Sequence, residues 1–258
     1  MALLEVNNLM LSFAGLDVIK DLSFTVDQGS IDSLIGPNGA GKTSVFNCLT
    51  GFYKPNDGNI TFDGNRIIRK KPHKITKHGM ARTFQNLRLF KSMTVLENVM
   101  SGMHCRTKSG PIAAVLRSPS QQREEEATRE FCRECLDFVG ILKFEDYVAS
   151  NLSYGNQRRV EWARALATKP KLLLLDEPAA GLNHDEKQQL ITLIKRIRDE
   201  LNITILLIEH DMGLVMKVSE KITVIDYGQK IAKGNAQEVQ NNQKVIEAYL
   251  GKEEDEIA

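Results

Sequence analysis

The chain lacks a long apolar run, and neither sign of charge is in excess. Nowhere in its 258 residues does an apolar run reach the roughly 20 residues that span a bilayer. Its 34 basic and 33 acidic residues leave a formal net charge of +1, so no overall field attracts nucleic acid or an anionic membrane surface. The start, MALLEVNNLM, lacks a basic region followed by an apolar stretch. We therefore expect a soluble, globular protein that is neither secreted nor self-inserted into a membrane.

Cysteine is also scarce. The four cysteines are Cys48, Cys105, Cys132 and Cys135. The last two form a C-x-x-C pair in an apparent helix, and a redox pair is one interpretation. Packing is the other, because Cys135 continues a helical stripe of Ala127, Phe131 and Phe138, and no second pair completes a zinc site. We favour packing, with reduced thiols in a cytosol.

The opening third has the alternation of half-buried strands. Leu22, Phe24 and Val26 are separated by polar residues, which predicts a small antiparallel sheet. The segment NITFDGNRI has a hairpin-type turn at Asp63 and Gly64 and is expected to join that sheet. A more apolar strand, SIDSLIG, lies between these elements and leads into a glycine-rich loop.

The later part of the chain alternates continuous apolar strands with a helix, after a helical region from about Thr94 to Pro170. That region opens with a capping box of Thr94 and Glu97. The strands KLLLLDEP and ITILLIEH indicate a parallel sheet covered on both faces. The helix between them is expected to bury Leu190, Ile191, Ile194, Ile197 and Leu201. The predicted fold is α/β, with a mainly parallel sheet, an antiparallel β subdomain and an inserted helical region.

The strongest motif is GPNGAGKTS, which matches G-x-x-x-x-G-K-[ST] between a strand and a helix. Its glycines let backbone N–H groups surround phosphates, Lys42 can reach the β and γ oxygens, and Thr43 can ligate Mg²⁺. A glycine-rich turn with a chance lysine is the alternative, and the flanking strand and helix argue against it. The predicted phosphate-binding residues are Gly36, Pro37, Asn38, Gly39, Ala40, Gly41, Lys42, Thr43 and Ser44.

Two acidic residues and a histidine follow buried strands. Asp176 and Glu177 end KLLLLDEP, and His210 follows ITILLIE. Open parallel sheets present their ligands outside the carboxyl ends of the strands, so all three are expected along one sheet edge. Asp176 is the Mg²⁺ candidate, Glu177 could polarise an attacking water, and His210 could bond a γ-phosphate. Alone, each is more often a solvated strand end.

A second anion-binding helix start is predicted at LSYGNQRR. Ser153 and Gly155 precede or open a helix, where free backbone N–H groups can hold an anion. Arg158 and Arg159 follow, and we expect them on an exposed helix face rather than in a phosphate or nucleic-acid patch. One chain therefore carries two half-sites for phosphate.

The order of phosphate loop, Gln85, LSYGN, LLLLDEP and His210 resembles the ATP-binding cassette of ABC transporters over the whole chain. The resemblance implies ATP and Mg²⁺ as cofactors and a pair of cassettes that sandwich two nucleotides. The signature element of one cassette closes over the ATP held by the other, which explains the two half-sites. That element comprises Leu152, Ser153, Tyr154, Gly155 and Asn156.

Further roles follow from the resemblance alone. Phe13 matches the aromatic that stacks on adenine, although packing within the small sheet is an alternative. Gln85 matches the loop glutamine that senses Mg²⁺ and water and meets the membrane partner, with residues 86–95 receiving that partner's helix. Residues 179–183 would communicate between the two sites, and Asn183 could also cap a helix with Glu186.

The sequence departs from the family pattern at three positions. The common signature is Leu-Ser-Gly-Gly-Gln, whereas Tyr154 replaces a glycine and Asn156 stands at the glutamine position. Asn183 stands where aspartate is common, which puts the detail of contact between the sites in doubt. The serine and the second glycine of the signature are retained, so we expect the anion site to be retained too.

Several segments narrow the resemblance to ATP-binding subunits of bacterial high-affinity branched-chain amino-acid importers. They are FNCLTGFYKP, RTFQNLRLF, DEPAAGLN, LLIEHDMGLVM and NNQKVIEAYLG. Implied partners are a second cassette, integral membrane permease subunits and, indirectly, a periplasmic solute-binding protein, at the cytoplasmic face of the inner membrane. Another cargo (a different amino acid or amide, urea, or exported lipopolysaccharide) and a soluble non-transport ATPase are the alternatives. No coiled-coil insertion or basic nucleic-acid footprint supports the last.

The whole of residues 1–258 is expected to form one cassette. Residues 1–85 and 165–258 would make the nucleotide-binding α/β core with its antiparallel β subdomain. Residues 86–164 would make the helical subdomain that carries the signature.

Overall fold

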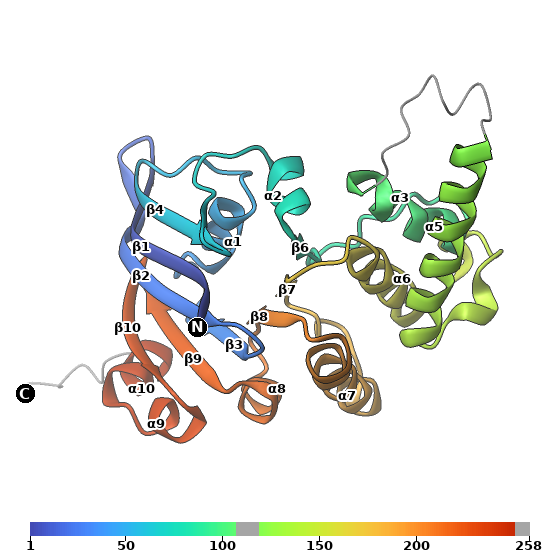
Figure 1. Ribbon diagram of the computed structural model, residues 1–258. Coiled ribbons are helices and arrows are strands. Elements are labelled where there is room, and N and C mark those ends of the chain that lie inside the picture. Colours follow the sequence, from blue (N-terminus) through green and yellow to red (C-terminus); the bar gives the residue numbers. More distant parts are fainter. Residues whose placement is uncertain (107–118, 251–258) are drawn as a thin grey trace, which may run out of the picture. The chain divides into compact units, whose positions relative to one another are not determined.

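The structure is a computed structural model that describes residues 1–106 and 119–250 (Figure 1). The chain divides into two compact units, one made of residues 1–75 and 174–258 and the other of residues 76–173. These crossing points differ by about ten residues from the functional boundaries expected at 85 and 165, and those boundaries stay a prediction. Within the described residues, no helix combines the length and the apolar character needed to span a bilayer.

The first unit contains the predicted antiparallel sheet, with strand order β2-β1-β4-β5. Its strands are β1 (Ala2–Phe13), β2 (Leu16–Asp27), β4 (Asp57–Phe62) and β5 (Asn65–Arg66). Leu22, Phe24 and Val26 are buried, as their alternation predicted. Asp63 and Gly64 connect β4 to β5 with φ values of 49° and 70°, the left-handed conformation that a tight two-residue hairpin requires.

The same unit contains a second, mainly parallel set of strands, in the order β10-β9-β3-β8-β7, which includes the predicted strands β3, β7 and β8. They are β3 (Ile31–Ile35), β7 (Leu172–Asp176), β8 (Thr204–Ile208), β9 (Lys221–Asp226) and β10 (Gln229–Gly234). Strand β3 pairs in parallel with β8 and β9, while β10 is antiparallel to β9. Every residue of β3, β7 and β8 is buried, which explains the continuous apolar runs of β7 and β8.

The described helices outside residues 79–171 are α1 (Lys42–Leu49), α2 (Pro72–His78), α7 (His184–Leu201), α8 (Met212–Val218), α9 (Ala236–Gln240) and α10 (Gln243–Leu250).

Helix α7 was predicted closely, except at its end. The capping box of Asn183 and Glu186 opens α7 as expected. Leu201, however, is 41% exposed. The left-handed Asn202 ends the helix, and Ile203 takes the buried position, with its N–H bonded to the Ile197 carbonyl.

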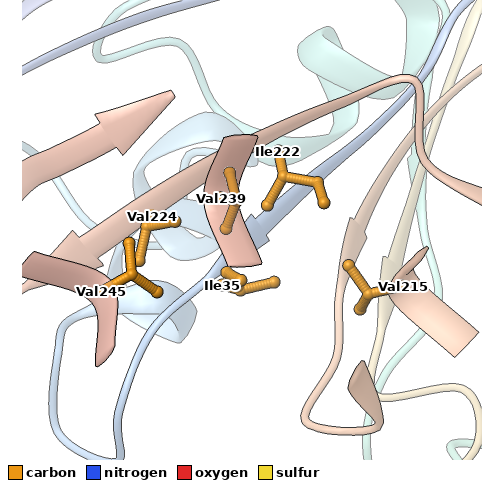
Figure 2. Packing of buried hydrophobic residues seen from close by; sticks show 6 residues of the cluster. All are labelled: Ile35, Val215, Ile222, Val224, Val239 and Val245. Carbon is orange, nitrogen blue, oxygen red and sulfur yellow. The ribbon is translucent and has the colours of Figure 1, made fainter. Parts of the chain in front are cut away.

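Helices α9 and α10 cover the sheet where β3 ends. Figure 2 shows Val239 of α9 and Val245 of α10 with Ile35, Ile222 and Val224 of the strands. All five side chains are buried. Because Ile35 is the residue before Gly36, this cluster supports the start of the glycine-rich loop.

The second unit is mainly helical, and the three α-helices among its described residues pack on one another (Figure 1). Its elements are β6 (Met80–Arg82), α3 (Val95–Gly102), α5 (Pro119–Phe138), α6 (Tyr154–Ala167) and the short turns η1 (Met103–Cys105), η2 (Leu142–Phe144) and η3 (Ala149–Asn151). The predicted capping box of Thr94 and Glu97 opens α3.

The cysteine pair packs inside this unit, although the stripe predicted for it was partly wrong. Ala127 is exposed, and the buried face of α5 is formed by Thr128, Cys132, Cys135 and Leu136. Burial raises the pKa of Cys132 to about 11 and that of Cys135 to about 12. Because the thiolate is the reactive form, both thiols are unreactive at neutral pH, which agrees with packing rather than redox chemistry.

Candidate functional site

The glycine-rich loop joins β3 to α1 in a form that few other residues allow. At Gly36, a Cβ atom would lie 2.0 Å from the carbonyl oxygen of Ile225. Gly39 and Gly41 have φ values of 80° and 99°, in the left-handed region that favours glycine. The loop thus has the tight, glycine-dependent turn that backbone N–H groups need in order to surround a phosphate.

Lys42 lies at the start of α1 and folds back over the loop. Its Nζ donates to the carbonyl oxygens of Gly36 and Pro37, at 2.8 Å each. Burial lowers the pKa of Lys42, while the negative charges of Glu177 and Asp176 oppose that shift. The ammonium and both carboxylates therefore belong to one electrostatic site in the first unit.

Oxygen groups suited to Mg²⁺ flank this ammonium. Thr43 is exposed in the first turn of α1, and Asp176 is buried at the end of β7. Hydroxyl and carboxylate oxygens are the donors that Mg²⁺ prefers, so these two residues fit the ion in chemical type. Gln85, the third predicted ligand, belongs to the other unit.

Glu177 and His210 meet at the carboxyl ends of β7 and β8, which confirms that they share a sheet edge. His210 Nε2 lies 2.5 Å from Glu177 Oε1. Glu177 adopts a φ of 49°, and its N–H donates to the Ile208 carbonyl at 2.9 Å. A strained residue held in this way is common at functional sites, and here it aims the carboxylate at the histidine.

Glu209 is a site residue that the sequence analysis missed. Its buried carboxylate accepts N–H bonds from Ala179 at 2.6 Å, from His210 at 2.9 Å and from Asp211 at 3.2 Å. It thus joins the loop after Glu177 to the segment that carries His210. The available signal was its position directly after the apolar strand β8 and directly before His210.

Two tyrosines also contact the predicted site without having been predicted. Phe13 ends β1 with 45% of its surface exposed, and Tyr53 meets it edge to face, with ring centroids 5.1 Å apart. Burial raises the pKa of Tyr249 in α10, and the backbone N–H of Gly36 opposes that shift. An exposed Phe13 face braced by Tyr53 is suited to stacking on a flat ring.

The second unit brings the signature and Gln85 together. The first N–H groups of a helix lack helical partners, and in α6 the side chain of the N-cap residue Ser153 does not bond to them. Arg158 Nη2 donates to the Tyr154 hydroxyl at 2.7 Å and to the Gln85 carbonyl at 3.3 Å. The expectation of an exposed face was wrong for Arg158, which is 4% exposed, because it turns inward to this loop.

The chain matches two family models. Residues 19–180 match the model described as ABC transporter. Residues 229–255 match the model described as branched-chain amino acid ATP-binding cassette transporter. The second match includes α9 and α10, which pack beneath the glycine-rich loop.

Curated relatives and a solved structure are similar over nearly the entire chain. The branched-chain amino acid transport ATP-binding protein BraF of Pseudomonas aeruginosa is 45% identical over 96% of this chain and 98% of its own length. The corresponding LivG protein of Escherichia coli K12 is 46% identical with the same coverage. A crystal structure of the ADP conformation of an ABC transporter cassette is 32% identical, with a TM-score of 0.85 over 98% of this chain and 100% of that chain.

Proposed function

This chain belongs to the ABC transporter family, as an ATP-binding and ATP-hydrolysing cassette, and from that premise we propose that it powers a membrane importer of branched-chain amino acids. The observation that carries the reaction is the single site in which Lys42 faces Asp176 and the Glu177–His210 pair. The cargo rests on the identity to BraF and LivG, whose names state that transport. The site residues assigned to this chain act on ATP and not on the cargo, so the cargo is proposed from likeness.

In the proposed reaction, the glycine-rich loop holds the phosphates of ATP. Its N–H groups and Lys42 neutralise the β and γ oxygens. Thr43 and Asp176, with Gln85, would hold Mg²⁺, which supplies further charge neutralisation when bound. Phe13 would stack on adenine, with Tyr53 bracing its edge.

Glu177 is the proposed general base. Phosphoryl transfer depends on positioning and on charge neutralisation more than on covalent help from the protein. Glu177 would accept a proton from the attacking water, while His210 holds the carboxylate in place and bonds the γ-phosphate. Gln85 would orient the same water.

The active form is proposed to be a dimer of cassettes. The free N–H groups of the first turn of α6, at Ser153, Tyr154, Gly155 and Asn156, would bind the γ-phosphate held by a second cassette. ATP then stabilises the closed pair, and hydrolysis removes the bridge. The second cassette is identical or, as the resemblance favours, a related protein.

The membrane setting is part of the proposal. Permease subunits would receive this cassette at residues 86–95, where Phe90 and Met93 are 52% and 39% exposed. A periplasmic solute-binding protein would deliver the cargo, and the cassette would lie peripherally on the cytoplasmic face of the inner membrane. The alternatives are another transported solute and a non-transport ATPase. Recovery of permease subunits with the chain from native membranes would exclude the non-transport ATPase. Identification of the recovered subunits would distinguish between the transported solutes.

A pair of substitutions tests the assigned chemistry. We expect Glu177→Gln to keep ATP affinity within about twofold while kcat falls at least about a hundredfold, because the amide cannot accept the proton. We expect Lys42→Ala to weaken ATP binding instead. Binding would be measured by fluorescence with a labelled ATP, and turnover by phosphate release.

The two variants also serve as each other's control. A normal rate in Glu177→Gln would exclude the carboxylate as the base. Tight ATP binding by Lys42→Ala would contradict the role of the glycine-rich loop. ATP should further trap Glu177→Gln as a dimer, detectable by size-exclusion chromatography with light scattering.

A further inference from the structure

One face of α6 is directed at the loop of residues 83–88, which carries Gln85. The residues of this face recur at intervals of three or four, so they lie on the same side of the helix. They are Tyr154, Arg158, Glu161 and Arg164, which together we call the α6 clamp. All of them, and the loop, belong to the second unit.

Two members of the clamp bind the ends of the loop directly. Glu161 Oε1 accepts the Phe84 N–H at 3.3 Å. Arg164 Nη1 donates to the Arg88 carbonyl at 2.6 Å. These bonds hold residues on both sides of Gln85, so the loop is fixed to the helix at two points.

The other two members link Gln85 to the signature, because Arg158 contacts both Gln85 and Tyr154. The guanidinium of Arg158 lies 5.1 Å from the centroid of the Tyr154 ring. The same group donates to the Tyr154 hydroxyl and to the Gln85 carbonyl. Tyr154 therefore has a physical task at the position where the common signature has glycine: its ring and hydroxyl hold the arginine that holds Gln85.

Packing alone does not explain these charged groups. Glu161 is 2% exposed and Arg158 is 4% exposed. Burial raises the pKa of Glu161 to about 7, against the opposing effect of the Phe84 N–H and of the Arg164 and Arg158 charges. Buried ion pairs are often no more stable than apolar residues of similar volume. Their directional bonds do, however, specify one position for the loop.

We propose that Tyr154, Arg158, Glu161 and Arg164 are positioning residues that fix Gln85 to the first turns of α6, so that the signature and the glutamine loop move as one body. This inference rests on the proposed roles of the signature and of Gln85. It deepens them, because a displacement of the loop by a membrane partner would reach Ser153 through the clamp.

Hydrogen exchange tests the clamp without any assumption about function. In Glu161→Ala, the Phe84 N–H loses its acceptor, so we expect exchange in a peptide spanning residues 83–88 to rise at least about tenfold. Glu161→Gln keeps an acceptor oxygen and should stay within about threefold of the unmodified protein. Arg159→Gln is the matched control, since Arg159 lies on the same helix but bonds the Val139 carbonyl.

Steady-state kinetics then test the positioning role. Because the glycine-rich loop belongs to the other unit, we expect Glu161→Ala to leave KM for ATP within about twofold and to lower kcat roughly tenfold. Glu161→Gln should restore kcat, and Arg159→Gln should not change it. Thermal unfolding monitors whether each variant is folded.

The outcomes separate the clamp from the proposed function. Unchanged exchange in folded Glu161→Ala would refute the clamp. Raised exchange with an unchanged kcat would refute its role in positioning Gln85. If the unmodified protein shows slow amide hydrogen exchange in residues 83–88 but no ATPase activity, the proposed function is wrong and the clamp is still supported.

Discussion

Asp32 is an acid in the middle of β3, a strand that is otherwise apolar apart from Ser33. It is 4% exposed, and its Oδ1 has no hydrogen-bond partner among the described residues. Burial raises its pKa to about 6, although Ser30, Lys233 and Lys221 act in the opposite direction. A carboxylate in this position opposes folding at neutral pH, because its charged form is poorly solvated.

The sign of the pH dependence follows from this shift. The folded pKa of about 6 lies above the reference value of 3.8, so the folded state holds the proton more tightly. Asp32 therefore lowers stability as pH rises between about 4 and 6, and its cost above that range is about 3 kcal/mol. We expect Asp32→Asn to raise the free energy of unfolding at pH 7 by about 1 to 3 kcal/mol, and to change it little at pH 4.

Urea unfolding between pH 4 and pH 8 measures this effect. Asp27→Asn is a suitable control, because the ion pair with Lys221 lowers the pKa of Asp27 and the substitution should bring no gain at pH 7. Equal gains at pH 4 and pH 7 in Asp32→Asn would show that charge burial is not the cause.

For single residues, the sequence predicted functional roles where the residues that act together are close neighbours in the chain. Gly36 to Ser44 could be predicted because the loop's chemistry lies within nine consecutive residues. Arg158 could not be placed, because its acceptor on Gln85 is 73 residues away and a charged residue on a helix is usually solvated. Glu209 was missed for a similar reason, since its bond to Ala179 spans 30 residues.

At the scale of elements, α9 and α10 show how the C-terminal helices support the site. Val245 of α10 is 6% exposed and packs in the cluster with Ile35 (Figure 2). Its neighbour Ile246 is 38% exposed. Adjacent helical residues face different sides of a helix. Substitution at each of these two positions therefore distinguishes the loss of buried packing from an effect on helix α10 itself.

We expect Val245→Ala to lower the free energy of unfolding by about 2 kcal/mol, because two buried carbons are lost and a cavity remains. Ile246→Ala should cost less than about 0.5 kcal/mol beyond its change in helix propensity. Urea unfolding of both variants checks the difference. Equal losses would mean that α10 does not pack in the cluster as the structure shows.

Helices and strands were predicted well where a local sequence pattern specifies them. They were predicted less well where packing against other elements determines which residues are buried. The predicted strands β3, β7 and β8 and the capping boxes of α3 and α7 are local signals and were correct. The buried face of α5 was misjudged because Ala127 and Thr128 are both compatible with a helix interior, and only the neighbouring helices determine which one is covered. The same limit applied to Leu201, since the chain reversal at Asn202 is not visible in the apolar periodicity.

At the scale of the whole molecule, the proposal predicts that no chain completes its own site. Each nucleotide would lie between the loop containing Lys42 of one cassette and Ser153 of another. A chain defective at Lys42 still has a good signature, and a chain defective at Ser153 still has a good phosphate loop. Two different inactive variants should therefore restore one another when they pair.

We expect Lys42→Ala and Ser153→Arg each to be nearly inactive alone, and an equimolar mixture to recover about a quarter of the normal ATPase rate. Random pairing makes half of the dimers mixed, and each mixed dimer has one intact site of two. Phosphate release at concentrations that favour dimers provides the measurement. The double variant Lys42→Ala with Ser153→Arg is the control, because when it pairs with the unmodified chain neither site is intact. Full activity in a dilute monomer would show that each chain hydrolyses ATP by itself. No recovery between folded single variants that form mixed dimers would show that two copies of this chain do not share their sites.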